Sequence, residues 1–232
     1  MATVKQQTAL IIGASRGLGL ALASEYLKRG WQVIATVRGP GTPLHSLRAS
    51  AGPKLEIEHL DIDVPSDLEA LRQHLEGRTL DLLFVNAGIS IDSDKTIGQI
   101  DTNAFTRMMV TNALSPMRII ETLESLVTPG GVIAAMSSGL GSVSNNTGGG
   151  WEAYRASKAA LNTLMRSYAA RQPVPTRTLL LIAPGWVRTD MGGEGATLEI
   201  SESIPLVVDV ITQQTGCSGL QYLTRLGETV PW

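Results

Sequence analysis

Tyr154 and Lys158 are the two residues of this 232-residue sequence whose types and spacing most directly indicate chemistry. They stand four positions apart, so a helix would place both on one face. A phenol has a pKa of about 10 and transfers protons poorly near neutral pH, but a neighbouring cation favours the phenolate and lowers that pKa. The pair therefore predicts a tyrosine that exchanges a proton with a substrate. The alternative is a surface tyrosine beside a solvated lysine, because this spacing occurs by chance on many helices.

A glycine-rich segment near the N-terminus predicts a phosphate-binding turn. Thr8–Ile12 has the pattern of a short buried strand, and an amphipathic helix follows to about Arg29. Gly13, Gly17 and Gly19 stand between them. Glycines let the backbone approach a pyrophosphate, and the helix N-terminus presents free N–H groups and the positive end of its dipole. The spacing differs from the Gly-x-Gly-x-x-Gly dinucleotide fingerprint, but the position between a strand and a helix supports this interpretation.

Apolar and amphipathic segments alternate along the whole chain. The expected strands are Thr8–Ile12, Trp31–Val37, Leu55–Leu60, Leu80–Val85, Gly131–Met136, Thr178–Ala183 and Leu220–Leu226. The expected helices are Leu18–Arg29, Pro43–Ala51, Ser66–Leu75, Asp101–Val127, Glu152–Ala170 and Glu199–Gln213. This alternation predicts an α/β fold: a single domain over residues 1–232 with a doubly wound parallel sheet (Rossmann) of about seven strands and helices on both faces. Ligands bind at the carboxyl ends of strands in such sheets, so the residues after each strand are candidates.

The end of the second expected strand indicates which cofactor would bind. NAD-binding folds usually place an acidic residue there, yet none occurs between Tyr26 and Leu55. Arg38 stands at this point, and Arg16 in the glycine loop provides a second cation. Guanidinium groups suit a 2′-phosphate, so NADPH is favoured over NADH. The alternative is an Arg38 side chain that is simply solvated.

Three further strand ends carry polar or small residues. Asp63 follows the third strand and has two interpretations: it accepts a hydrogen bond from the adenine amino group, or it caps the helix that begins near Ser66. Asn86-Ala87-Gly88 follows the fourth strand, where small residues allow close approach of a cofactor. Ser137 and Ser138 follow the fifth, and a hydroxyl there suits a substrate carbonyl, although paired serines are often turn residues.

Pro116 lies four residues after Asn112 within the expected helix Asp101–Val127. A proline has no N–H to donate to the Asn112 carbonyl, and its ring opens that turn of the helix. The freed carbonyl needs another partner, and a bound water is the obvious one. The alternative is a tolerated kink that has no catalytic role.

Composition excludes several classes of protein. The net charge is −2 and 43% of the residues are hydrophobic, so the chain can bury a core but has no strongly basic patch for nucleic acid. The single cysteine, Cys217, cannot form an intrachain disulfide, which fits a reducing compartment. No apolar run approaches the length of a membrane span or a signal-peptide core. We therefore expect a cytoplasmic protein with no nucleic-acid or membrane partner, and we expect no metal site.

Together these motifs resemble the classical short-chain dehydrogenase/reductase family across essentially the whole chain. The motifs that carry the resemblance are the glycine loop, Asn86-Ala87-Gly88, Ser138, Tyr154-x-x-x-Lys158 and Pro184-Gly185. Three segments are more narrowly similar to the C-factor and sniffer-type carbonyl reductases. They are residues 149–158, residues 184–191 and the terminal Val230-Pro231-Trp232.

The resemblance implies a role for each residue of the expected site. Tyr154 would be the general acid that protonates the carbonyl oxygen as hydride arrives, and Lys158 would lower its pKa and hold the nicotinamide ribose. Ser138 would orient the carbonyl and stabilise developing negative charge. Asn112 would hold a water that connects Lys158 to solvent. Thr189 would bind the carboxamide of the cofactor.

The resemblance also implies the residues that line the site. The expected cofactor contacts are Gly13, Ser15, Arg16, Gly17, Leu18, Gly19, Arg38, Asp63, Val64, Asn86, Ala87, Gly88, Tyr154, Lys158, Pro184, Gly185, Val187 and Thr189. The expected substrate contacts are Ser138, Trp151, Trp186 and Met191, although a tryptophan is also a common core residue. Many relatives have a longer segment than the one between Asp190 and Glu199, so we expect an open pocket suited to small or aromatic carbonyl compounds.

Two functions agree with these features. The first is NADPH-dependent reduction of a small or aromatic aldehyde or ketone. The second is a cofactor-sensing or signalling protein of the C-factor type with little turnover. The full set Asn112, Ser138, Tyr154 and Lys158 favours the enzyme, because a sensor needs the glycine loop but no proton donor. A homodimer or homotetramer through the two long helices is expected, as in many relatives.

Overall fold

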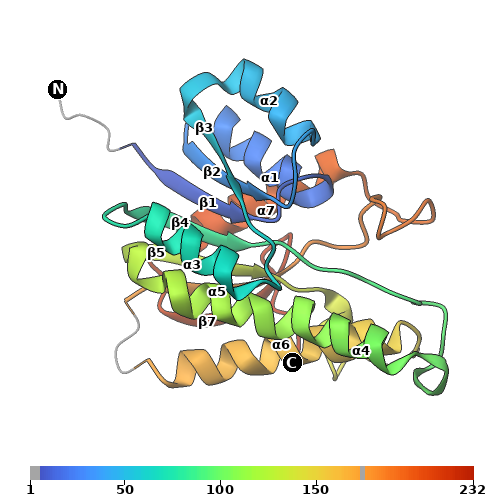
Figure 1. Cartoon of the computed structure of the whole chain (residues 1–232). Coiled ribbons are helices and arrows are strands. Elements are labelled where there is room, and N and C mark those ends of the chain that lie inside the picture. Colours follow the sequence, from blue (N-terminus) through green and yellow to red (C-terminus); the bar gives the residue numbers. More distant parts are fainter. Residues whose placement is uncertain (1–5, 173–175) are drawn as a thin grey trace.

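A seven-stranded parallel sheet forms the centre of the computed structural model, which describes residues 6–172 and 176–232 (Figure 1). Its strands are β1 (Thr8–Ile12), β2 (Gln32–Val37), β3 (Leu55–His59), β4 (Leu80–Val85), β5 (Val127–Met136), β6 (Thr178–Ala183) and β7 (Gly219–Thr224). They lie in the order β3-β2-β1-β4-β5-β6-β7. The chain therefore builds outward from β1 in one direction and then crosses to β4 and builds in the other. This topology confirms the predicted doubly wound fold.

Helices cover both faces of the sheet (Figure 1). They are α1 (Gly17–Lys28), α2 (Pro43–Ala51), α3 (Pro65–His74), α4 (Thr102–Met109), α5 (Ser115–Leu123), α6 (Glu152–Ala170) and α7 (Ile200–Gln214). Helices α1, α2 and α7 lie on one face, and α3, α5 and α6 lie on the other with α4 beside α6. Within the described residues, none of these helices is both long and apolar enough to cross a lipid bilayer.

Each strand contributes to two separate core layers because successive side chains point to opposite faces. In β1, Leu10 and Ile12 belong to the cluster that contains residues of α3, α5 and α6. Ala9 and Ile11 belong to the cluster that contains residues of α1 and α7. Burial on both faces explains why the strands appear in the sequence as nearly continuous apolar runs.

The helix expected over Asp101–Val127 is interrupted, which corrects the prediction of one continuous element. Helix α4 ends at Met109, a π-helical turn covers Val110–Leu114, and α5 begins at Ser115. The Ser115 N–H donates to the Val110 carbonyl, five residues back, instead of the usual four. Because Pro116 has no N–H, the regular bonding pattern cannot run through this point. Strand β5 also begins at Val127, earlier than expected.

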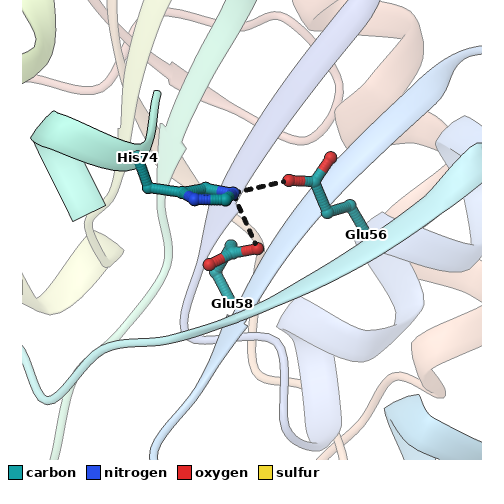
Figure 2. Close-up of side chains that lie close together, drawn as sticks. All are labelled: Glu56, Glu58 and His74. Carbon is teal, nitrogen blue, oxygen red and sulfur yellow. Dashed lines mark hydrogen bonds and ion pairs between the residues drawn. The ribbon is translucent and has the colours of Figure 1, made fainter. Parts of the chain in front are cut away.

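A network of ion pairs ties the edge strand β3 to the segment around α3 (Figure 2). The Arg78 guanidinium donates to both carboxylate oxygens of Glu56, at 2.6 and 2.8 Å, and lowers the pKa of Glu56 to about 2. The His74 Nε2 atom lies 3.2 Å from Glu56 Oε1 and 3.4 Å from Glu58 Oε1. These ion pairs connect the sheet edge at β3 to the end of α3 and the residues that follow it.

Gly19 lies against the glycine loop and the end of β4. A Cβ added there would overlap the Gly13 carbonyl oxygen and lie 2.7 Å from Asn86 Nδ2. We expect Gly19→Ala to lower the free energy of unfolding by about 1 to 3 kcal/mol, because the close packing of α1 against the glycine loop must yield. Urea denaturation measures this effect. Gly98→Ala is the control, since nothing lies within 4 Å of its added Cβ, and equal stability losses in both variants would contradict the packing argument.

Candidate active site

A cleft of about 960 Å³ opens where the strands end, and it brings together most of the predicted site residues. The predicted residues that line it are Gly13, Ser15, Arg16, Gly17, Leu18, Arg38, Asp63, Asn86, Ala87, Gly88, Ser138, Trp151, Tyr154, Lys158, Pro184, Gly185, Trp186, Val187, Thr189 and Met191. The strand order reverses between β1 and β4, so the loops after these strands diverge and leave a crevice between them.

Three predicted residues do not line the cleft. Gly19 lies behind the glycine loop, against Gly13. Val64 is exposed and precedes α3 as its N-cap residue. Asn112 is fully buried, and its side chain accepts from the Ile89 N–H at 2.8 Å and donates to the Ile89 carbonyl at 2.8 Å.

The Asn112 side chain also reaches helix α6. Its Nδ2 atom donates to the hydroxyl of Ser157 at 2.9 Å, and that hydroxyl donates to the Tyr154 carbonyl at 2.7 Å. Asn112 therefore connects the loop after β4 to the helix that carries Tyr154 and Lys158. Sequence reasoning considered the Asn112 carbonyl but assigned no role to Ser157, which is one of the three positions between Tyr154 and Lys158.

Tyr154 and Lys158 lie on one face of α6, and the Lys158 ammonium is 5.8 Å from the centre of the Tyr154 ring. Lys158 is only 3% exposed, and its Nζ donates to the Met136 carbonyl at 3.0 Å. Burial lowers the pKa of Lys158 to about 8. Protein atoms also crowd the Tyr154 hydroxyl, and this burial raises the pKa of the phenol to about 12, although a hydrogen bond with Ser138 lowers it.

These pKa directions correct the expectation that Lys158 lowers the pKa of Tyr154. In this structure burial is the largest influence on both groups, and it favours the neutral form of each. The group that opposes the rise in the Tyr154 pKa is Ser138, not Lys158. Tyr154 is consequently protonated near neutral pH.

The two serines after β5 have different surroundings. The Ser137 hydroxyl is buried and donates to Asn162 Oδ1 at 2.7 Å, so it is committed to the fold. The Ser138 hydroxyl faces Tyr154, and its oxygen accepts from the Leu140 N–H at 3.1 Å. The Ser138 carbonyl accepts a hydrogen bond from the Tyr222 hydroxyl. Sequence reasoning missed Asn162 and Tyr222, which are far away in the chain.

Asp63 is held by two hydroxyls from the interrupted helix. Thr111 and Ser115 donate to its two carboxylate oxygens at 2.6 and 2.7 Å. The interpretation of Asp63 as a helix cap is wrong, because Val64 is the N-cap of α3 and no side chain caps that helix. Thr111 and Ser115 escaped sequence reasoning because they are 48 and 52 residues from Asp63.

Arg16 and Arg38, the two cations expected near the 2′-phosphate of the cofactor, differ in whether they form an ion pair. Arg16 forms an exposed ion pair with Asp190 across the cleft. Arg38 is exposed and forms no ion pair with any residue that the structure describes. Thr36, at the end of β2, accepts a hydrogen bond from the Gly13 N–H at 2.9 Å and so holds the glycine loop. A polar residue inside an apolar strand was the signal that could have identified Thr36.

The two tryptophans expected in the pocket lie on the cleft and not in the core. Trp151 adopts a left-handed backbone with φ of 53°, and its ring meets the Tyr154 ring edge to face at 5.8 Å. Trp186 is 52% exposed, and its indole N–H donates to the Gly192 carbonyl at 2.8 Å. Met191 is also exposed at the cleft. Apolar side chains therefore border the cleft, and that of Trp151 lies beside Tyr154.

Comparisons with known proteins agree with this geometry. The short chain dehydrogenase family model matches residues 7–197. A Burkholderia multivorans structure with bound NADP, described as a short-chain dehydrogenase/reductase, is 52% identical, covers 98% of this chain and 100% of its own, and has a TM-score of 0.96. A carbonyl reductase from Pseudomonas aeruginosa PAO1 in complex with NADP is 37% identical with the same coverage and a TM-score of 0.91.

The narrower resemblance is also confirmed. The C-signal protein of Myxococcus xanthus is 35% identical over 155 residues, which are 66% of this chain and 93% of that protein. With its doubly wound sheet, its glycine loop and the Tyr154 and Lys158 pair on α6, the chain belongs to the short-chain dehydrogenase family of oxidoreductases.

Proposed function

We propose that this protein uses NADPH to reduce a small or aromatic aldehyde or ketone to an alcohol, with Tyr154 as the proton donor. The observation that carries the proposal is that Tyr154, Ser138 and the buried Lys158 line one cleft, with the Lys158 ammonium 5.8 Å from the centre of the Tyr154 ring. A carbonyl oxygen within reach of both hydroxyls would receive a proton from one and a hydrogen bond from the other.

The cleft suits a dinucleotide phosphate. Helix α1 begins at Gly17 with no side-chain cap, so its first N–H groups remain available to an anion. Gly13 has a φ of +83°, and a Cβ there would lie 2.7 Å from the Ala87 Cβ, so the loop needs glycine to reach this shape. Arg38 supplies an uncommitted guanidinium for a 2′-phosphate. The NADP bound by the Burkholderia and Pseudomonas relatives supports the same choice.

The remaining roles belong to side chains of this chain, while bound NADPH would supply the hydride. Tyr154 enters the reaction protonated, because burial raises the pKa of its phenol. Ser138 would stabilise negative charge as it develops on the substrate oxygen. Lys158, whose pKa of about 8 is close to neutral, is suited to return a proton toward Tyr154. Asn112 is a positioning residue, since it fixes Ile89 and Ser157.

A sensing or signalling role is the second candidate, and the similarity to C-signal is the observation that favours it. One experiment distinguishes the reductase from the sensor. A panel of aldehydes and ketones is incubated with NADPH, and the absorbance of the cofactor is followed. Turnover of any of these compounds that depends on Tyr154 supports the reductase. Tight NADPH binding without turnover supports the sensor.

We expect Tyr154→Phe to lower kcat by about 10²- to 10⁴-fold, which is the usual contribution of a general acid. NADPH affinity should stay close to normal, because the variant loses only the hydroxyl. Steady-state kinetics and cofactor titration test this. The matched control is Tyr168→Phe on the same helix, whose hydroxyl donates to Glu124 and lies outside the cleft. Near wild-type turnover by Tyr154→Phe would rule out the proposed donor.

The protein should bind NADPH more tightly than NADH, and Arg38→Asp should remove or reverse that preference. Loss of a charge-assisted hydrogen bond costs about 1.5 to 3 kcal/mol, or roughly 10- to 150-fold in affinity. Titration of both cofactors provides the measurement, with the exposed residue Arg48, outside the cleft, changed to Asp as the control. Tighter binding of NADH by the unmodified protein would contradict the role of Arg38.

The depressed pKa of Lys158 predicts a pH-dependent stability. Its folded pKa of about 8 lies below the ordinary value of 10.5, so the unfolded chain binds more protons between these pH values. Lys158 therefore makes the free energy of unfolding rise with pH in this window, by at most about 1.4 kcal/mol per pH unit. The free energy of unfolding is measured for wild type and Lys158→Met from pH 7 to 10. With rising pH, that of wild type should increase relative to that of the variant. A constant difference between the two proteins would show that folding does not lower the pKa of Lys158.

A further inference from the structure

Arg225 is an unpaired cation on the wall of the cleft, and it has no role in the proposed binding of NADPH or in the proposed proton transfer. It follows β7 and lines the cleft. Its Nε atom is buried and has no hydrogen-bond partner. Across residues 6–172 and 176–232, its guanidinium forms neither a hydrogen bond nor an ion pair. A buried donor without a partner is unfavourable, so this position is suited to a ligand that supplies an acceptor.

The Arg225 side chain reaches back over the end of β6. Its backbone N–H donates to the Ala183 carbonyl at 3.0 Å, which anchors the residue beside that strand. Its Nη1 atom lies 3.2 Å from the place that a Cβ on Gly185 would occupy. The glycine therefore leaves the room in which the guanidinium lies. Since β6 is the neighbour of β5, the charge extends toward the side of the cleft that holds Ser138.

The strand order separates Arg225 from the expected phosphates of the cofactor. Neighbouring strands are about 4.8 Å apart, so β7 lies roughly 19 Å from β1, whose end carries the glycine loop. It lies roughly 24 Å from β2, whose end carries Arg38. The distance to β5, which leads to Ser138, is only about 10 Å. Arg225 is therefore placed to meet the substrate rather than the phosphates.

Two other arginines that line the cleft already have acidic partners. Arg188 pairs with Glu199 at 2.8 Å, and Arg16 pairs with Asp190. No carboxylate of the described chain neutralises Arg225. A guanidinium in a partly closed site binds carboxylates through charge-assisted, often paired hydrogen bonds.

We propose that Arg225 binds a carboxylate on the carbonyl substrate, so that the enzyme prefers aldehydes or ketones that carry a negative charge. The inference rests on the proposed reductase function and names the class of substrate. The apolar surfaces of Trp151 and Trp186 on the same cleft suit the uncharged part of such a compound.

The test compares two aldehydes that differ in charge, 4-carboxybenzaldehyde and 4-methylbenzaldehyde, each with saturating NADPH. Wild type should show the higher kcat/KM for the carboxylate. Arg225→Gln should lower that value by about 10- to 150-fold, the range for a lost charge-assisted hydrogen bond, and leave the neutral aldehyde nearly unchanged. Arg225→Lys, which keeps the charge, should retain part of the preference. Arg48→Gln is the control, because it removes an equal charge outside the cleft.

Several results would overturn the proposal. One is an equal loss of kcat/KM for both aldehydes in Arg225→Gln, and another is an Arg225→Gln variant that still prefers the carboxylate. A third is a variant whose affinity for NADPH falls while its preference between the two aldehydes does not change. If wild type reduces neither these two aldehydes nor any compound of the panel, the reductase function fails, but the role of Arg225 is still testable by binding. In that case, calorimetric titration of the NADP⁺-bound protein with benzoate should show binding by wild type and none by Arg225→Gln, and equal binding by both would refute the proposal.

Discussion

The close contact between the glycine loop and the end of β4 is the constraint on which the rest of the site depends. Asn86 donates to the Gly13 carbonyl at 2.9 Å, and the Ala87 N–H donates to the Ile12 carbonyl at 3.1 Å. Only a residue without a side chain fits at position 13, because a Cβ would meet Ala87. This contact holds β1 and β4 together at the point where the strand order reverses. It thereby aims the uncapped start of α1 into the cleft.

Burial, rather than a charge pair, is the largest influence on the pKa values of Tyr154 and Lys158. Lys158 is buried, and its ammonium donates a hydrogen bond to the Met136 carbonyl at the end of β5. Removing water from an ammonium and a phenol favours the neutral form of both. Tyr154 is consequently protonated near neutral pH, while the pKa of the neighbouring Lys158 is lowered to about 8.

Unpaired positive charges lie at two separate places along the cleft, at the ends of β2 and β7. Arg38 at the end of β2 and Arg225 at the end of β7 are both without acidic partners among the described residues, and Ser138 and Tyr154 lie between them. The arginines at intermediate positions are neutralised by Asp190 and Glu199. Two separated, unpaired cations suit two separate anions, and the proposals above assign one to the cofactor and one to the substrate.

The sequence by itself determined the elements whose pattern is local. Strands β1, β4 and β6 and helices α2 and α6 begin and end where apolar runs and helical periodicity place them. The Tyr154 and Lys158 pair was predictable for the same reason, since a helix brings residues four positions apart together. Ser137, Ser138 and the glycine loop were predicted to lie at the site because each comes directly after an expected strand.

The tertiary structure decided whatever depends on contacts between distant residues. The interruption before Pro116 became a π-helical turn whose Thr111, together with Ser115 at the start of α5, reaches back to Asp63. The direction of the Tyr154 pKa depended on burial, which a spacing of residues does not report. Arg225 carried no motif, and it became significant because parallel strands place their carboxyl ends at one edge, where a residue near the C-terminus shares a cleft with the glycine loop.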